Sequence, residues 1–244
     1  MQLDGKTILV TGAAHRIGRA IAQALAAGGA EVIVHAHRSM AEAEALAASL
    51  QTETRRAWAL QADLADPAAV VRLAAEALAL TGRVDVLVNN ASVFERQPMA
   101  TATVADWDRH MAINVRAPWL LTQALAPAMQ AAGAGKVVNL TDYLAVRPVP
   151  DYVPYEVSKA ALDGLTRALA KAYAPAIQVN AVALGPILPA AGMSDEEQEK
   201  LIRRLPLQRW GSPEDVVKAV RFLIVDADFA TGSTVAIDGG SLLR

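Results

Sequence analysis

Short apolar runs alternate with helix-like stretches along almost the whole chain. Runs such as KTILV at 6–10, EVIVH at 31–35 and KVVNL at 136–140 are continuous and rich in β-branched residues. Such runs are typical of strands that are buried on both faces of a parallel sheet. Between them, apolar residues recur at helical spacing. The alternation predicts an α/β fold, a Rossmann-type doubly wound parallel sheet with helices on both of its faces.

No linker, repeat or low-complexity tract divides the sequence, so we expect a single domain over 1–244. The predicted strands lie at 6–10, 31–35, 57–61, 84–89, 136–140, 177–182 and 234–238, and the predicted helices at 16–27, 40–50, 67–80, 104–132, 152–173 and 213–225. The segment 184–207 interrupts this alternation with glycines and prolines, then a charged helix, SDEEQEKLIRR. We expect a substrate lid at about 187–207; the alternative is a simple surface excursion.

Composition excludes several classes of function. The formal charge is −2, so no basic face for nucleic acid is expected. There are no cysteines, which excludes disulfides, thiolate metal sites and a cysteine nucleophile. We expect no metal site. No apolar run reaches 18 residues and the N-terminus lacks a signal-peptide pattern, so we expect a cytoplasmic enzyme without a membrane partner.

A glycine-containing turn follows the first predicted strand. It reads Thr11-Gly12-Ala13-Ala14-His15-Arg16-Ile17-Gly18 and opens the helix over 16–27. The backbone N–H groups of such a turn, at the positive end of a helix, can bind a pyrophosphate. Two glycines at this spacing also occur in ordinary tight turns, so the turn alone leaves both interpretations open.

The end of the second predicted strand bears on the choice of dinucleotide. A site for NAD places Asp or Glu there to accept hydrogen bonds from the ribose hydroxyls. Here the chain reads His35-Ala36-His37-Arg38-Ser39, without an acid. Arg and Ser would bind a 2′-phosphate that a carboxylate would repel, and Arg16 can approach the same phosphate. The segment therefore indicates NADPH, unless it is only a solvated basic turn.

Two further strand ends carry polar residues that suit a dinucleotide. Asp63 follows the third strand, where it can reach the adenine amino group. Asn89, Asn90 and Ala91 follow the fourth strand, where backbone and amide groups can line the nicotinamide ribose.

Tyr155 and Lys159 are four residues apart, which places both on one face of the helix over 152–173. A phenol with a pKa of about 10 is a poor acid–base group at neutral pH. A nearby ammonium and a cationic nicotinamide are expected to lower that pKa. Asn114, on the preceding helix, could hold a water that passes protons to Lys159. The Tyr-x-x-x-Lys pattern is common by chance, and its weight comes from its position after the strand KVVNL.

Together these segments resemble the short-chain dehydrogenase/reductases over nearly the full chain. The matching segments are TGAAHRIG, ADL, NNAS, the Asn114 helix, YEVSK, LGP and TGSTVAIDGG. The resemblance implies that Tyr155 is the proton donor, that Lys159 assists it and binds the ribose, and that Asn114 is a relay.

Three departures from that family's pattern resemble the pteridine reductases. Arg16 replaces the middle glycine of the turn, Asp142 replaces the serine 13 residues before Tyr155, and NNAS replaces NNAG. This resemblance implies NADPH, a pterin substrate and a homotetramer. It further implies that Phe94 stacks on the pterin and that Ser92 faces it. In those enzymes a C-terminal arginine reaches a neighbour's site, and Arg244 is the candidate here.

The exchange of serine for Asp142 makes chemical sense for a pterin. An Asp–Tyr pair can deliver a proton to a ring nitrogen while hydride reaches the adjacent carbon. Three alternatives stay open. Asp142 could act as an acceptor in an altered ketone reductase, the chain could be a carbonyl reductase such as a 3-oxoacyl reductase, or it could be a non-catalytic NADP(H) sensor. The retention of Tyr155, Lys159 and Asn114 argues against the sensor.

The resulting site prediction has three parts. The catalytic set is Asp142, Tyr155, Lys159 and Asn114; the cofactor set is Gly12, Arg16, Ile17, Gly18, His37, Arg38, Ser39, Asp63, Leu64, Asn90, Ala91, Ser92, Lys159, Gly185 and Pro186; the substrate set is Ser92, Phe94, Asp142 and Tyr155.

Overall fold

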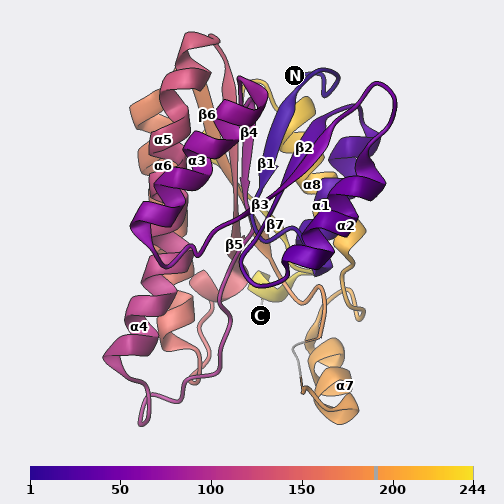
Figure 1. Ribbon diagram of the computed structural model, residues 1–244. Helices are drawn as coiled ribbons and strands as arrows, with labels where there is room; N and C mark the ends of the chain where they lie inside the picture. The colour runs from indigo at the N-terminus through magenta and orange to yellow at the C-terminus, as the bar shows by residue number, and fades with distance from the viewer. Residues whose placement is uncertain (190–191, 244) are drawn as a thin grey trace.

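The computed structural model describes residues 1–189 and 192–243, and it confirms the predicted α/β class (Figure 1). These residues form one seven-stranded parallel sheet in the order β3-β2-β1-β4-β5-β6-β7. The strands are β1 (Thr7–Val10), β2 (Glu31–Ala36), β3 (Ala57–Gln61), β4 (Val86–Asn89), β5 (Gly135–Asp142), β6 (Ile177–Leu184) and β7 (Thr234–Ile237). The strand order reverses between β1 and β4, and ligands of open α/β sheets bind at such a reversal, beyond the carboxyl ends of the strands.

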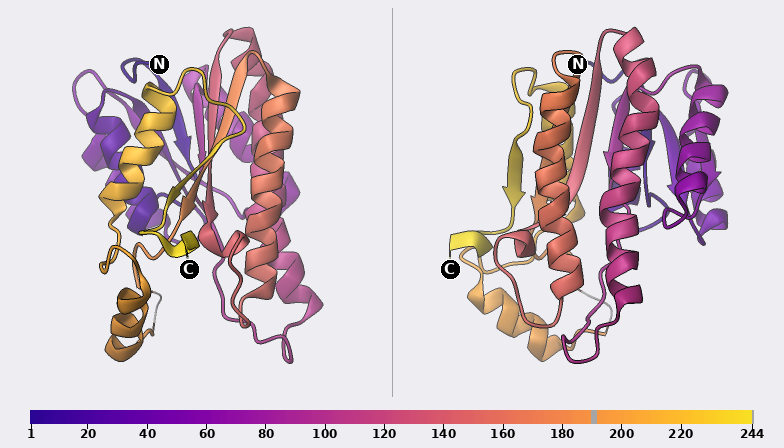
Figure 2. Two further views of the ribbon diagram at one scale, coloured as in Figure 1. Left: turned by 180° about the vertical axis from the view of Figure 1, so that it is seen from behind. Right: turned by 90° about the vertical axis from the view of Figure 1, so that its left-hand side faces the viewer.

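Helices cover both faces of the sheet (Figure 2). The helices are α1 (Arg16–Ala27), α2 (Met40–Leu50), α3 (Pro67–Thr81), α4 (Val104–Met111), α5 (Ala117–Ala131), α6 (Val153–Tyr173), α7 (Asp195–Arg204) and α8 (Pro213–Val225), with short turns η1 (Ala112–Arg116), η2 (Tyr143–Ala145) and η3 (Ser241–Leu243). One core cluster joins the sheet to α1, α2 and α8, and a second joins its other face to α3, α5 and α6. The core is aliphatic, with many alanines where helices meet the sheet.

The predicted bounds of α1, α2, β3 and α8 match the structure, and most others differ by one or two residues. The single helix expected over 104–132 is wrong. It is divided into α4, the π-helical turn η1 and α5. Pro118 lacks the N–H that an α-helix would direct to the carbonyl of Asn114, and within η1 the N–H of Ala117 donates to the carbonyl of Ala112, five residues back. The π turn places Asn114 between the two helices.

Helix α7 lies apart from the sheet, at the end where the strands finish (Figure 1). Ser194 caps it, since its hydroxyl accepts from the N–H of Glu197 at 3.3 Å and its own N–H donates to the Glu197 carboxylate at 2.8 Å. None of its residues is buried. A local cap rather than core packing therefore stabilises this helix. Among the described residues, no helix is both long and apolar enough to cross a membrane.

Gly18 is required by close packing in the first turn of α1. A Cβ at this position would lie 2.4 Å from the carbonyl oxygen of Gly12 and 2.5 Å from the Asn90 amide nitrogen. Gly164, inside α6, offers the opposite case, because a Cβ there meets no atom within 4 Å apart from its chain neighbours and the backbone of its own helix.

We expect Gly18→Ala to lower the free energy of unfolding by about 1–3 kcal/mol, because backbone atoms must move to admit the methyl group. The matched control Gly164→Ala should raise it by about 0.5–1 kcal/mol, since alanine loses less entropy in a helix. Each kcal/mol shifts Tm by about 2–4 °C in a chain of this size, so thermal unfolding followed by circular dichroism can measure both. Equal Tm changes in the two variants would contradict the packing argument.

Candidate active site

A groove of about 440 Å³ lies beyond the carboxyl ends of β1, β2, β3 and β4. Residues of the predicted cofactor set line it: Gly12, His37, Arg38, Ser39, Asp63, Leu64, Ala91 and Ser92. Gly12 has a φ of 62°, and a Cβ there would come within 2.9 Å of the Cα of Ala91. Only glycine allows the turn to approach β4 this closely.

The basic cluster after β2 is accessible. His37 and Arg38 are exposed, and Ser39 is partly exposed at the start of α2. The Nε2 atom of His37 lies 3.8 Å from the carboxylate of Asp63. Arg38 forms no ion pair with any other described residue. This rim of the groove therefore presents a guanidinium and a hydroxyl that are available to an anion.

Arg16 points away from this cluster in the structure, and its approach to the same phosphate stays a prediction. It adopts the left-handed region with a φ of 50°, and its guanidinium donates to the carbonyl of Pro189 at 3.2 Å. Arg16 and Ile17 line a second cavity, on the side of β6. The backbone conformation at the start of α1, which the sequence pattern does not specify, determines this direction.

The amide side chains after β4 also point elsewhere than predicted. Asn90 donates both amide hydrogens to the turn, at 2.8 Å to the Thr11 carbonyl and 3.0 Å to the Gly12 carbonyl. Asn89 donates to the Asn139 side chain at 2.8 Å, inside the sheet. Their role is to hold strand ends together, and the groove is lined instead by Ala91 and Ser92.

Tyr155 and Asp142 come together at the edge of the second cavity, which has a volume of about 340 Å³. The hydroxyl of Tyr155, on α6, donates to the carboxylate of Asp142, the last residue of β5, at 2.7 Å. The other carboxylate oxygen accepts from the N–H of Leu144 at 2.9 Å. Asp142 is therefore oriented by two donors, with one oxygen held at the phenol.

Burial changes the acid–base properties of this pair. Burial raises the pKa of Asp142, although the Leu144 N–H, the Tyr155 hydroxyl and the Lys159 charge oppose the rise. Burial, and after it the adjacent Asp142, raise the pKa of Tyr155 well above its ordinary value. We expected neighbouring charges to lower the pKa of Tyr155, but the protein groups around it raise that pKa. Tyr155 stands as a neutral proton donor, because a phenolate beside Asp142 would be both desolvated and repelled.

Lys159 lies under the ring of Tyr155. Its ammonium is 5.7 Å from the ring centroid and donates to the carbonyl of Leu140 at 2.7 Å. Burial lowers its pKa to about 8, against the opposing effect of Asp142. At neutral pH Lys159 therefore carries its positive charge, and its ammonium is bound by the strand carbonyl of Leu140.

Asn114 connects the loop after β4 to α6. Its side-chain oxygen accepts from the Val93 N–H at 2.9 Å and from the Ser92 hydroxyl at 3.2 Å, and its amide nitrogen donates to the Ser158 hydroxyl at 2.9 Å. Lys159 is not among its partners in the described residues. The proton relay stays a prediction, whereas a structural link between the loop and α6 is evident.

Phe94 belongs to an aromatic cluster at the second cavity. Its ring stacks on Tyr152 at 4.8 Å with an interplanar angle of 8°, and it meets Tyr155 edge to face at 4.7 Å. Phe94 is 44% exposed, so it is not an anchor packed into the core. Gly185, Pro186 and Trp210 line the same cavity, together with Met193 and Leu201 of the predicted lid. Ser92, which was expected beside both the cofactor and the substrate, lines the nucleotide groove.

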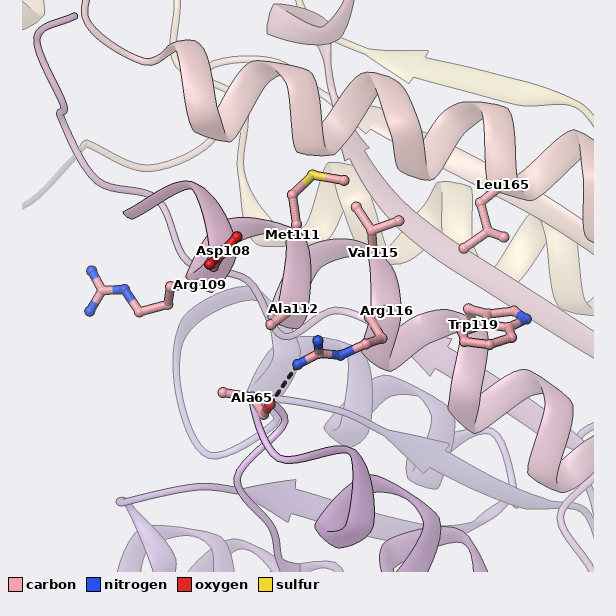
Figure 3. A pocket seen from close by; sticks show the side chains of 9 residues that line it. All are labelled: Ala65, Asp108, Arg109, Met111, Ala112, Val115, Arg116, Trp119 and Leu165. Atoms are coloured by element: carbon pink, nitrogen blue, oxygen red, sulfur yellow. Dashed lines mark hydrogen bonds between the residues drawn. The ribbon is translucent and has the colours of Figure 1, made fainter. Parts of the chain in front are cut away.

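A third cavity, of about 900 Å³, adjoins the nucleotide groove, with which it shares Ala65 and Arg109 (Figure 3). Its lining side chains come mainly from α4, η1 and α5 and include Trp119, Met111 and Val115. The guanidinium of Arg116 donates across it to the carbonyl of Ala65 at 2.8 Å. None of the predicted catalytic residues lines this cavity, so its size alone does not mark it as the reactive site.

Sequence reasoning missed several residues that shape the site. Tyr152 and Ser158 flank Tyr155 and lie in or beside the YEVSK segment, which was the available signal. His35 and His110 are buried, and no periodicity or motif distinguishes them. His110 lies with its ring 6.4 Å from that of Tyr155, and its Nε2 atom has no partner among the described residues. Arg244, the candidate for a neighbour's site, lies outside the described residues.

Comparison with known proteins identifies the family. A family model described as enoyl-(acyl carrier protein) reductase matches residues 12–241. The human dehydrogenase/reductase SDR family member 4 is 38% identical over 99% of this chain and 89% of its own length. The 3-oxoacyl-[acyl-carrier-protein] reductase of Synechocystis is 34% identical over 99% and 98%.

A solved structure adds a further relative. FolM alternative dihydrofolate reductase 1 from Brucella canis, in complex with NADP, is 36% identical, covers 100% of this chain and 97% of its own, and superposes with a TM-score of 0.92. Relatives with different substrates thus share the same length of chain and similar identity, which leaves the substrate open. The family is not in doubt: this chain belongs to the short-chain dehydrogenase/reductases.

Proposed function

We propose that this chain is an NADPH-dependent reductase that transfers a hydride to a pterin-type substrate, such as biopterin, a dihydropterin or dihydrofolate. The observation that carries the proposal is the 2.7 Å hydrogen bond from Tyr155 to the half-buried Asp142 at the edge of an aromatic cavity. An acid at this place suits a substrate with ring nitrogens better than one with a single carbonyl oxygen.

The groove fits NADPH on two grounds. The tight approach of Gly12 to Ala91 leaves room for backbone contact with a pyrophosphate beside α1. Arg38 and Ser39 would hold the 2′-phosphate, and the end of β2 offers no carboxylate to repel it. Lys159 would bind the nicotinamide ribose. When bound, NADPH supplies the hydride.

The protein's own residues would supply the proton. Tyr155 donates its hydroxyl proton to a ring nitrogen of the substrate, and the raised pKa keeps that proton in place until it is needed. Asp142 accepts a hydrogen bond from the Tyr155 hydroxyl, and its raised pKa favours uptake of a proton from solvent, which it can then pass to the phenolate. Lys159 limits the cost of the transient phenolate through its charge below the ring.

The aromatic cluster supports a flat substrate. Phe94 and Tyr152 form a stacked pair at the cavity, and Trp210, Met193 and Leu201 add apolar surface from the lid side. Aromatic contacts of this kind contribute about 0.5–1.5 kcal/mol beyond buried area. The lid at 187–207 stays a prediction; its described part contributes to the cavity wall.

A carbonyl reductase is the second candidate, because the Synechocystis 3-oxoacyl reductase is a relative over nearly its whole length. The FolM relative favours the pterin reading. The homotetramer implied by resemblance also stays a prediction. The cavity over α4, η1 and α5 exposes Trp119 together with side chains of both charges, Asp108 and Arg116, which suits a self-complementary contact with a second copy.

The substrate assignment can be tested with NADPH and a panel of biopterin, dihydrobiopterin, dihydrofolate and an acetoacetyl thioester. We expect turnover of a pterin, and a loss of about 10–100-fold in kcat/KM for that pterin in Phe94→Ala, since a misplaced acceptor carbon reacts slowly. Phe229→Ala, at a fully exposed site, is the control. Rapid reduction of the thioester with no pterin turnover would overturn the substrate while leaving the family intact.

The cofactor assignment concerns Arg38. Arg38→Asp should weaken NADPH binding by about 10–150-fold, the worth of one charge-assisted contact, and should affect NADH much less. Arg56→Asp makes the same charge change at an exposed position before β3, at the opposite end of the sheet. Calorimetric titration of both variants measures the effect. Equal affinity of the unaltered chain for NADH and NADPH would contradict the assignment.

The proton-donor assignment predicts a change in pH dependence. Asp142 raises the pKa of Tyr155, so Asp142→Ser should lower that pKa and the donor should deprotonate at a lower pH. The alkaline limb of kcat/KM for reduction should therefore move to lower pH, in addition to a lower maximal rate. Initial rates from pH 5 to about 11 would show it, because a limb that lies at or above the top of this range in the unaltered chain should enter the range in Asp142→Ser. An unmoved alkaline limb would remove Asp142 from the proton path.

A further inference from the structure

His35 is a buried polar residue that the proposed reaction does not use. It lies on β2, is 1% exposed, and is one of the residues that line the nucleotide groove. Its Nδ1 atom accepts from the N–H of Gly12 at 3.1 Å, and its Nε2 atom faces the carbonyl of Ala62 at 3.1 Å. One side chain thus touches the ends of three neighbouring strands, β1, β2 and β3.

These contacts fix the chemical form of the ring. A backbone N–H can only donate and a carbonyl can only accept, so Nδ1 carries a lone pair and Nε2 carries the hydrogen. The imidazole is therefore neutral. Burial, with a smaller contribution from His37, lowers the pKa of His35 to about 4, and the same neutral form holds throughout the physiological range.

The two partners of His35 belong to two different segments that form the groove, the glycine turn and the end of β3. Gly12 begins the glycine turn, whose next amide, of Ala13, donates to the backbone carbonyl of His35 at 2.9 Å. Ala62 directly precedes Asp63 and Leu64, which line the groove on the β3 side. The ring therefore spans the distance between the turn and the adenosine side of the groove.

We infer that His35 is a positioning residue for the dinucleotide, which sets the glycine turn in its binding geometry through the Gly12 N–H. The inference rests on the proposed NADPH site. Without the Nδ1 acceptor, the partly buried Gly12 N–H is left unpaired, and the turn gains free energy by moving to another arrangement. The affinity for the dinucleotide then falls in proportion to the fraction of molecules whose turn keeps the binding geometry.

Two substitutions separate the contacts of His35. The amide oxygen of His35→Asn can occupy the place of Nδ1 and accept from Gly12. The amide nitrogen of His35→Gln can occupy the place of Nε2 and donate to Ala62, but it leaves Gly12 without an acceptor. His35→Leu removes both contacts. The backbone bond from Ala13 is common to all three variants.

We expect Kd for NADPH to rise by about 10-fold or more in His35→Gln and His35→Leu, and by no more than about threefold in His35→Asn. KM for the second substrate should change by less than about twofold, because its cavity lies on the far side of the turn. Fluorescence titration gives Kd, and hydrogen exchange of the Gly12 amide, measured without cofactor, should be slow in the unaltered chain and in His35→Asn but fast in His35→Gln.

Thr122→Val is the control for general destabilisation. Thr122 is buried in α5, and its hydroxyl donates to the Pro118 carbonyl at 2.7 Å, away from the groove. It should lower Tm without changing Kd. Circular dichroism establishes whether each variant is folded. If His35→Leu does not fold, the comparison of His35→Asn with His35→Gln tests the inference.

Three results would overturn the inference: an unchanged Kd in folded His35→Gln, equal losses in His35→Asn and His35→Gln, or fast exchange of the Gly12 amide in the unaltered chain. Failure of the unaltered chain to bind NADPH would instead refute the proposed function, and the exchange rates would still report whether His35 holds the turn.

Discussion

The reversal of strand order between β1 and β4 is the constraint on which the site depends. The chain leaves these two neighbours in opposite directions, so no short connection joins their carboxyl ends. Polar side chains join them instead. The Thr11 hydroxyl accepts from the N–H groups of Asn90 and Ala91 at 3.0 Å each, while the Asn90 amide returns two bonds to the turn. Because each unpaired buried group would cost about 1–3 kcal/mol, this arrangement holds the turn without a ligand.

A second polar chain positions the proton donor. Asn89 on β4 donates to Asn139 on β5 at 2.8 Å, and Asn139 donates to Thr166 on α6 at 2.9 Å. Asp142 ends β5 and Tyr155 lies in the first turn of α6, so both partners of the reactive pair belong to elements tied by the same network. The 2.7 Å contact between them is therefore a consequence of rigid strand and helix packing rather than of a loop conformation.

The positions of strands and helices could be predicted from the sequence, whereas the directions of most side chains in the site could not. The bounds of α1, α2, β3 and α8 follow from periodicity and from local helix starts, such as Ser212 before α8. The π turn at Asn114 does not, because it arises where Pro118 removes one hydrogen bond from an otherwise continuous helix. Motif spacing brought Tyr155, Asp142 and Lys159 together correctly. It could not show that Asn90 bonds inward, since an amide serves the protein and a ribose equally well.

Arg16 shows how one backbone angle redirects a functional side chain. At a φ of 50° a non-glycine residue is strained by about 1–2 kcal/mol, a cost that the glycine of the family pattern would avoid. In return, its guanidinium spans from the glycine turn to the carbonyl of Pro189 after β6. Arg16 thereby connects the two cavities. It belongs to the glycine turn that forms part of the nucleotide groove, and its side chain lines the aromatic cavity. The departure from glycine that suggested a subgroup in the sequence is, in the structure, the physical link between the two halves of the site.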